Sequence, residues 1–181
     1  MSAGGPESML PPGPPPAAPA TLPPLPDPAV KRPLGRTILF TAISMGFYPF
    51  YWFYKNRPLV SAEVGGKDDA ALQTAGLAVP ILQFFIIYWL WRDIDLMRRR
   101  LGLAEVPALL YVLLSAFIPF AQIVCYILVA EKLNEYWDWR TQGQATDAPT
   151  TRGEVAVVVA GATFFVLYFA AMVAVFVLSV S

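Results

Sequence analysis

Histidine is absent from this sequence of 181 residues, and cysteine occurs only once, at Cys125. A chain without histidine lacks the commonest metal ligand and general base, and a single cysteine cannot form an intrachain disulfide. Cys125 has no base or cation beside it in the sequence that would favour the thiolate form. No nucleophile is accompanied by a base, and no glycine-rich phosphate loop is present. We therefore expect no catalytic residues, no metal site and no cofactor site, and we predict that the protein is not an enzyme.

Charge is also scarce. Only 14% of the residues are charged, where about a quarter is typical of a soluble protein. Lysine plus arginine equals aspartate plus glutamate, so the formal net charge is zero, and the two signs are interspersed along the chain. A nucleic-acid partner requires a continuous basic surface that neutralises phosphates. The sequence offers none, so nucleic acid is excluded as a partner.

The charged residues avoid four long apolar runs, which cover residues 37–54, 70–91, 106–130 and 155–181. Each run has about the 17–25 residues that a helix needs to cross a bilayer core. The runs are continuous and do not alternate as the strands of a membrane β-barrel do. The sequence therefore predicts an all-α membrane protein with four transmembrane helices, in which the lipid bilayer is the first partner.

The first apolar run contains two residues that interrupt helices, Gly46 and Pro49. Proline removes a backbone donor, and glycine adopts turn conformations readily. We expect a kinked crossing here, with a re-entrant hairpin as the alternative. The second helix should begin near Ala70, where Asp68 or Asp69 is placed to cap it.

The N-terminal segment, residues 1–33, holds twelve of the eighteen prolines. Such a composition predicts a disordered tail with polyproline II character, because proline cannot build a hydrogen-bonded helix. The tail contains the spacing that proline-motif-binding domains recognise, so such a domain is a candidate partner. A solvated spacer is the simpler interpretation of the same composition.

Three further segments complete the expected organisation. Residues 34–140 form a three-helix membrane domain with amphipathic helix extensions, residues 141–154 a polar loop, and residues 155–181 a C-terminal transmembrane helix. In one extension, Arg98, Arg99 and Arg100 follow one another. Such a cluster can bind anionic lipid headgroups or serve as a topological anchor.

The aromatic end of the first run carries a family resemblance. It includes Gly46, Tyr48, Pro49, Tyr51, Trp52 and Lys55, and residues 131–137 add Asn134 and Trp137. Together they resemble the signature of a bacterial membrane family catalogued as domain of unknown function 4234. Ser44, Met45 and Phe47 depart from the threonine, leucine and isoleucine of the family pattern. The resemblance would cover about residues 31–140, and it implies a multi-pass protein of the bacterial cytoplasmic (inner) membrane, without catalytic residues to transfer.

The expected function is that of a non-catalytic integral membrane protein: an adaptor, an accessory subunit or a membrane-organising protein. Another membrane protein or a second copy of the chain is a candidate partner. A small oligomeric transporter or channel is the alternative, with Gln83 and Gln122 facing each other as its polar lining. Coupled transport usually places an ionisable residue inside the membrane, and the apolar runs contain none. We expect a cytoplasmic N-terminus because the tail then need not be translocated, although lysine and arginine counts do not decide the orientation of a four-span chain.

Overall fold

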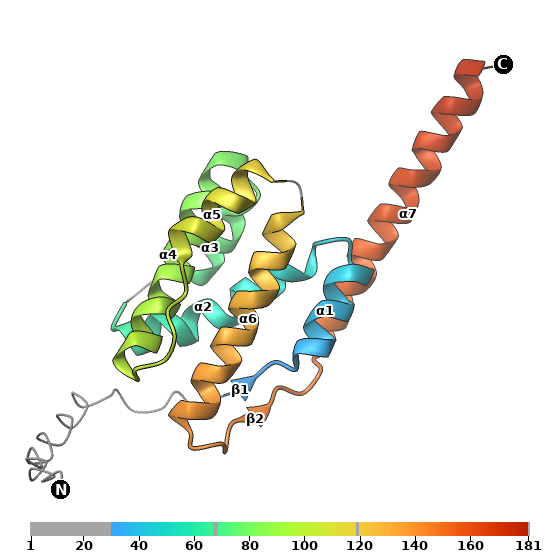
Figure 1. Ribbon diagram of the computed structural model, residues 1–181. Coiled ribbons are helices and arrows are strands. Elements are labelled where there is room, and N and C mark those ends of the chain that lie inside the picture. Colours follow the sequence, from blue (N-terminus) through green and yellow to red (C-terminus); the bar gives the residue numbers. More distant parts are fainter. Residues whose placement is uncertain (1–29, 67–68, 119, 181) are drawn as a thin grey trace, which may run out of the picture.

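The computed structural model of the protein describes residues 30–66, 69–118 and 120–180, and the predicted tail lies outside these residues up to position 29. The described residues form seven helices and one pair of short strands (Figure 1). The elements in chain order are β1 (Val30–Lys31), α1 (Leu34–Ile43), α2 (Tyr48–Val64), α3 (Ala70–Gly76), α4 (Pro80–Arg100), α5 (Ala108–Phe117), α6 (Ala121–Arg140), β2 (Thr146–Asp147) and α7 (Arg152–Val180).

Each of the first three apolar runs is interrupted in its middle by a turn. The first breaks between α1 and α2, where Met45 and Gly46 have positive φ angles of 50° and 92°. The second breaks between α3 and α4, and Pro80 begins the new helix, where its missing N–H costs no hydrogen bond. The third breaks between α5 and α6 at Phe120, whose φ is 65°. Each of these apolar runs is therefore divided between two helices, and the second helix of each run continues beyond it, so that α2, α4 and α6 have 17, 21 and 20 residues.

The prediction of four transmembrane helices is wrong, because these turns interrupt three of the four apolar runs. Within the part of the chain that the structure describes, only α7 is both long and apolar enough to cross a membrane, with a mean hydropathy of 2.3 over its most apolar window. The apolar helices α1 and α5 have ten residues each, which span about 15 Å, whereas a bilayer core is about 30 Å thick. The preferred kinked crossing of the first run is wrong for the same reason. Run length alone does not show where a chain turns back.

The core lies among α2, α4 and α6, which contribute its largest buried side chains. Trp52 of α2, Leu90 and Ile94 of α4, and Leu133 and Trp137 of α6 are almost completely buried. The strands join in parallel at one end, with Val30 opposite Thr146. This pairing ties the last residues of the predicted tail and the predicted polar loop to the end of the molecule where α4 and α6 finish (Figure 1).

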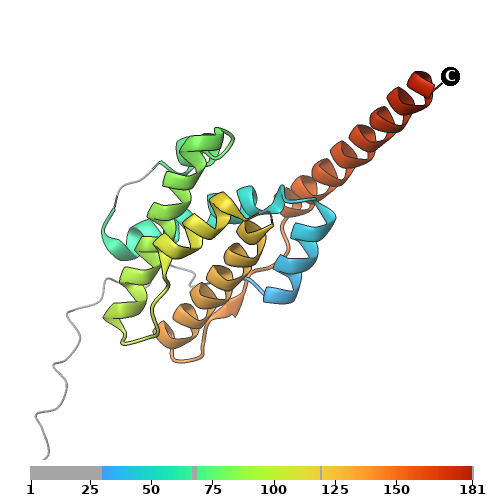
Figure 2. The ribbon, with the colours of Figure 1, turned by 45° about the horizontal axis from the view of Figure 1, so that its top comes forward.

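The opposite end of the bundle carries exposed apolar side chains. The α3–α4 and α5–α6 turns lie toward the top in Figure 1, and in both Figure 1 and the rotated view of Figure 2 α7 extends past the α1–α2 turn toward the upper right. We call these turns and their adjoining helix ends the apolar end. Its exposed large side chains include Met45, Phe47, Val79, Ile81, Leu82, Phe85, Leu113, Phe117, Ile118, Phe120 and Val124.

Helix α7 packs through its first turns and then runs free of the bundle (Figure 1). A Cβ atom added at Gly161 would lie 2.6 Å from the Ser44 carbonyl oxygen, so only glycine permits this approach to the α1–α2 turn. Phe164, three residues later, makes an edge contact with Phe47 at 5.5 Å between ring centroids. Beyond that point the side chains of α7 are largely exposed.

Candidate functional site

A cavity of about 230 Å³ lies between α2, α4 and α6, close to the apolar end. Its walls come from all three interrupted runs, so it exists only because the turns bring those runs together. The lining contains no charged side chain. It consists of Gly46, Pro49, Phe50, Trp52, Phe53, Leu77, Gln83, Ile87, Leu90, Trp91, Gln122, Ile123 and Tyr126.

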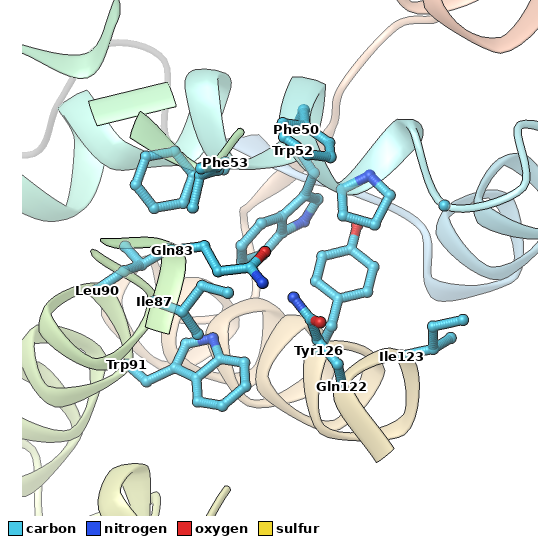
Figure 3. Close-up of a pocket in the computed structure, with 13 residues that line it drawn as sticks. Phe50, Trp52, Phe53, Gln83, Ile87, Leu90, Trp91, Gln122, Ile123 and Tyr126 are labelled. Carbon is cyan, nitrogen blue, oxygen red and sulfur yellow. The ribbon is translucent and has the colours of Figure 1, made fainter. Parts of the chain in front are cut away.

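Two primary amides provide the polar part of the lining. Gln83 extends from α4 and Gln122 from α6, and Figure 3 shows both amide groups ending near each other in the middle of the cavity. Both side chains are half-buried, and neither takes part in a hydrogen bond with another described residue. The sequence-based expectation that these two glutamines face each other agrees with this geometry.

Aromatic rings form much of the remaining wall. Trp52 meets Tyr126 edge to face, with ring centroids 5.1 Å apart, and Trp91 meets Tyr111 in the same way at 6.1 Å. Such contacts fix ring orientation and leave flat apolar surfaces toward the cavity. Gly46, Pro49 and Trp52 belong to the resemblance signature, so part of that signature lines the cavity.

The two signature tyrosines, Tyr48 and Tyr51, contact the beginning of α7 and do not line the cavity. Tyr48 is completely buried, and its hydroxyl donates a 2.6 Å hydrogen bond to Oε1 of Glu154, near the beginning of α7. The Tyr51 hydroxyl lies 2.6 Å from the Thr151 hydroxyl. Arg32 and Arg36 stand 3.7 and 3.6 Å from the same Glu154 carboxylate. These contacts anchor α7 to α1 and α2.

The other signature residues have structural positions. Lys55 is exposed, with its ammonium over the rings of Tyr51 and Tyr54 at 5.8 and 5.7 Å. Asn134 accepts a hydrogen bond from the Arg32 backbone N–H and donates one to the Arg32 carbonyl. Trp137 is completely buried in the core. None of these three lies in the cavity wall.

The three consecutive arginines are unequal. Arg98 is completely buried and donates to the Ala104 and Lys132 carbonyls and to the Glu135 carboxylate. Because it has no exposed surface, Arg98 cannot meet a lipid headgroup. Arg99 and Arg100 are exposed; Arg99 pairs with Asp95, and Arg100 donates to the Glu63 carbonyl.

A second buried acid, Glu63, joins α2 to α6. Its carboxylate lies 3.5 Å from the Arg140 guanidinium and accepts a 3.2 Å hydrogen bond from the Tyr136 hydroxyl. Burial raises the pKa of the Glu63 carboxyl, and Arg140, Tyr136 and Arg100 oppose that rise. The sequence analysis identified neither Glu63 nor Glu154 as a functional or structural residue. For Glu154 a signal existed, because Thr151 and Glu154 form a capping box in which each side chain meets the backbone N–H of the other.

The arrangement therefore combines an uncharged, aromatic cavity containing two amides with buried ion clusters that hold its walls. Among the described residues no group of three or more histidine, cysteine, aspartate or glutamate side chains is placed to bind a metal ion. The cavity can bind a neutral molecule by apolar contact and amide hydrogen bonds.

In comparisons with known proteins, no family model, no curated protein and no solved structure matches this chain.

Proposed function

We propose that this chain is a non-catalytic integral membrane protein in which α7 crosses the bilayer and the apolar end is embedded in the same membrane without crossing it. In this arrangement the helix ends on each side of a turn reach into the lipid, and the chain returns at the turn. The end that carries β1, β2 and the charged helix ends faces water. The molecule would serve as a membrane-anchored adaptor or accessory subunit, or as a protein that organises the lipid around its embedded turns.

The distribution of exposed apolar side chains carries this proposal. Phe117 and Phe120 flank the α5–α6 turn with exposed fractions of 80% and 81%. Soluble monomers rarely expose apolar patches larger than a few hundred Å², and transfer of one such side chain out of water is favourable by about 1.5–3 kcal/mol. The three runs that form the apolar end contain no charge at all. Lipid is the surrounding that suits this surface.

With a single crossing, the positive-inside rule can indicate the orientation of the protein in the membrane. Every lysine and arginine of the sequence lies at or before Arg152, and residues 155–181 contain none. If only α7 crosses, twelve of the thirteen basic residues precede it and Arg152 is its first residue, so all thirteen lie at one side of the membrane. This bias supports a cytoplasmic N-terminus. The resemblance of residues 31–140 adds the bacterial cytoplasmic membrane to the proposal.

Cysteine accessibility tests this arrangement directly. In a Cys125→Ser background, Lys55→Cys and Arg92→Cys place single thiols after the first and second apolar runs, and Ser179→Cys places one near the end of α7. Embedded turns put positions 55 and 92 on the same side, so a membrane-impermeant maleimide should modify neither in intact cells and both after the membrane is opened. Position 179 should react in intact cells.

Opposite accessibility of positions 55 and 92 would contradict the proposal, because full crossings separate these positions. A second readout is depth. An environment-sensitive fluorophore on Phe117→Cys should be quenched by nitroxide-labelled lipid and protected from iodide. The matched control, Trp139→Cys, replaces another exposed aromatic at the charged end of the bundle and should show the reverse pattern.

A further inference from the structure

We propose that the cavity between α2, α4 and α6 binds the head group of a lipid-soluble carbonyl compound of the quinone class. The ligand's carbonyl oxygens would accept hydrogen bonds from the Gln83 and Gln122 amides, and its ring would lie against the aromatic walls. This inference deepens the proposed function and rests on it for the route of entry, since a ligand of this kind reaches the cavity from the membrane interior.

The amides select for a ligand with hydrogen-bond acceptors. Each glutamine side chain carries two N–H donors and one acceptor oxygen, and neither the Gln83 nor the Gln122 side-chain amide bonds to another described residue. An amide kept from water without a partner costs about 1–3 kcal/mol. A plain acyl chain in the cavity would leave both amides in that state. Ligand carbonyl oxygens placed between Gln83 and Gln122 would accept hydrogen bonds from both side-chain amides.

The walls select for a flat and neutral group. Phe50, Trp52, Phe53, Trp91 and Tyr126 supply aromatic surface, and no lysine, arginine, aspartate or glutamate reaches the cavity. A phosphate or carboxylate head group would be buried there without a counter-charge, which is strongly unfavourable. A neutral ring can stack on or meet the edges of the wall rings.

The size of the cavity sets how much of the ligand enters. At about 230 Å³ it is smaller than the roughly 300–1,000 Å³ of sites that enclose drug-sized molecules. It therefore admits one ring and not a whole lipid. The adjacent Gly46, Pro49 and Leu77 belong to the turns of the apolar end or adjoin them, so an alkyl tail attached to the ring can continue into the surrounding lipid.

Tryptophan fluorescence tests the binding, because Trp52 and Trp91 line the cavity and quinones quench tryptophan. The purified full chain in detergent micelles is titrated with decylubiquinone. We expect a saturable quenching component above the linear quenching caused by partition into micelles. Decylbenzene has a ring and tail but no carbonyl oxygen, and an excess of it should fail to displace the quinone.

Substitutions locate the site. Gln83→Leu with Gln122→Leu removes both amides at similar volume, and the apparent Kd for decylubiquinone should rise at least about tenfold, as expected for two lost hydrogen bonds. Ile87→Phe fills the cavity and should remove saturable quenching. Gln73→Leu, on α3 and outside the cavity lining, is the matched control and should bind like the natural chain. Circular dichroism confirms that each variant is folded.

Two results would overturn this inference: no saturable quenching in the natural chain, or the same apparent Kd in the natural chain and the double glutamine variant. Effective competition by decylbenzene would also overturn it, since the carbonyl oxygens would then contribute nothing. Flotation of the same preparation with phosphatidylcholine vesicles separates the two proposals. If the protein floats but does not bind quinone, the proposed ligand is wrong and the proposed membrane arrangement stands. If it binds quinone in micelles but does not float, the proposed membrane arrangement is wrong.

Discussion

Glu154 is the residue on which the attachment of α7 depends. Its side chain is completely buried and serves Tyr48, Arg32 and Arg36 together. A buried carboxylate in such a position is not a large source of stability in itself, but its removal leaves two guanidinium groups without their counter-charge. The same residue closes the capping box of α7 with Thr151.

We therefore expect Glu154→Gln to lower the free energy of unfolding by about 3 kcal/mol or more, since breaking a buried ion pair typically costs 3–5 kcal/mol. Thermal or denaturant unfolding in detergent micelles measures the change. Glu105→Gln is the control, because Glu105 pairs with Arg99 on the exposed surface and should change stability by less than about 1 kcal/mol. Equal losses in the two variants would show that the Glu154 cluster has no special role.

Glu63 makes stability depend on pH in an unusual direction. Burial raises its pKa in the folded protein above the ordinary value of 4.5, so the folded state holds this proton more tightly than the unfolded state. The contribution of Glu63 to stability is fully present below pH 4.5 and is lost as pH rises through the raised pKa. Arg140, Tyr136 and Arg100 face this carboxyl and limit the effect.

The expected result is a decrease in unfolding free energy as pH rises from 4.5 through the raised pKa, and Glu63→Gln should flatten that part of the profile. Denaturant unfolding of both chains at a series of pH values gives the comparison. Glu135 provides an internal contrast, because Lys132 and Arg98 lower its pKa and its contribution is lost as pH falls. Identical pH profiles of natural chain and Glu63→Gln would contradict the assignment.

At the scale of elements, the contact between α7 and the α1–α2 turn depends on a close backbone approach at Gly161. A methyl group there would stand 2.6 Å from the Ser44 carbonyl oxygen, and a backbone atom cannot move aside as the end of a side chain can. Gly161→Ala should therefore destabilise the protein by about 1–3 kcal/mol, the usual cost of overpacking.

Gly153 supplies the matched control within the same helix. A Cβ atom there would be 3.6 Å from the Tyr51 ring, which is ordinary contact, and alanine favours helix by up to about 1 kcal/mol over glycine. Gly153→Ala should be neutral or stabilising. Melting temperatures of the two variants in micelles measure the difference, and a tolerated Gly161→Ala would mean that α7 does not pack against the turn in solution.

At the scale of the whole molecule, two surfaces can hold the protein in a membrane: the free part of α7 and the apolar end. A chain that ends at Phe165 keeps the packed turns of α7 but has only fourteen of its residues, which span about 21 Å and cannot cross the core. We expect this shortened chain still to float with phosphatidylcholine vesicles, because the apolar end remains.

Paired charge substitutions in the shortened chain then identify the embedded surface. Phe117→Asp with Phe120→Asp puts two carboxylates at the α5–α6 turn and should abolish flotation. Trp139→Asp, at an exposed aromatic near the charged end, should leave flotation unchanged. Loss of flotation on shortening alone would assign all membrane attachment to α7.

The sequence by itself determined that the apolar runs are helical, because continuous apolar runs without alternation favour helices. It also located particular boundaries: Asp69 caps α3 as expected, with its carboxylate accepting from the Ala71 and Leu72 N–H groups. The lack of charge in the runs is a local property, and so is the absence of histidine. Such properties can be read without knowing which segments meet.

Only the tertiary structure decided how the runs are used. A run of some twenty apolar residues is long enough for one crossing, but it can also be divided by a turn between two helices. Positive φ angles at Met45 and Gly46 in the first run and at Phe120 in the third place such a turn there. The partners of Glu154 and Glu63 lie about a hundred and about seventy positions away along the chain, so no local pattern could reveal them. The amide-lined cavity has the same origin, because Gln83 and Gln122 share it only through the packing of α4 against α6.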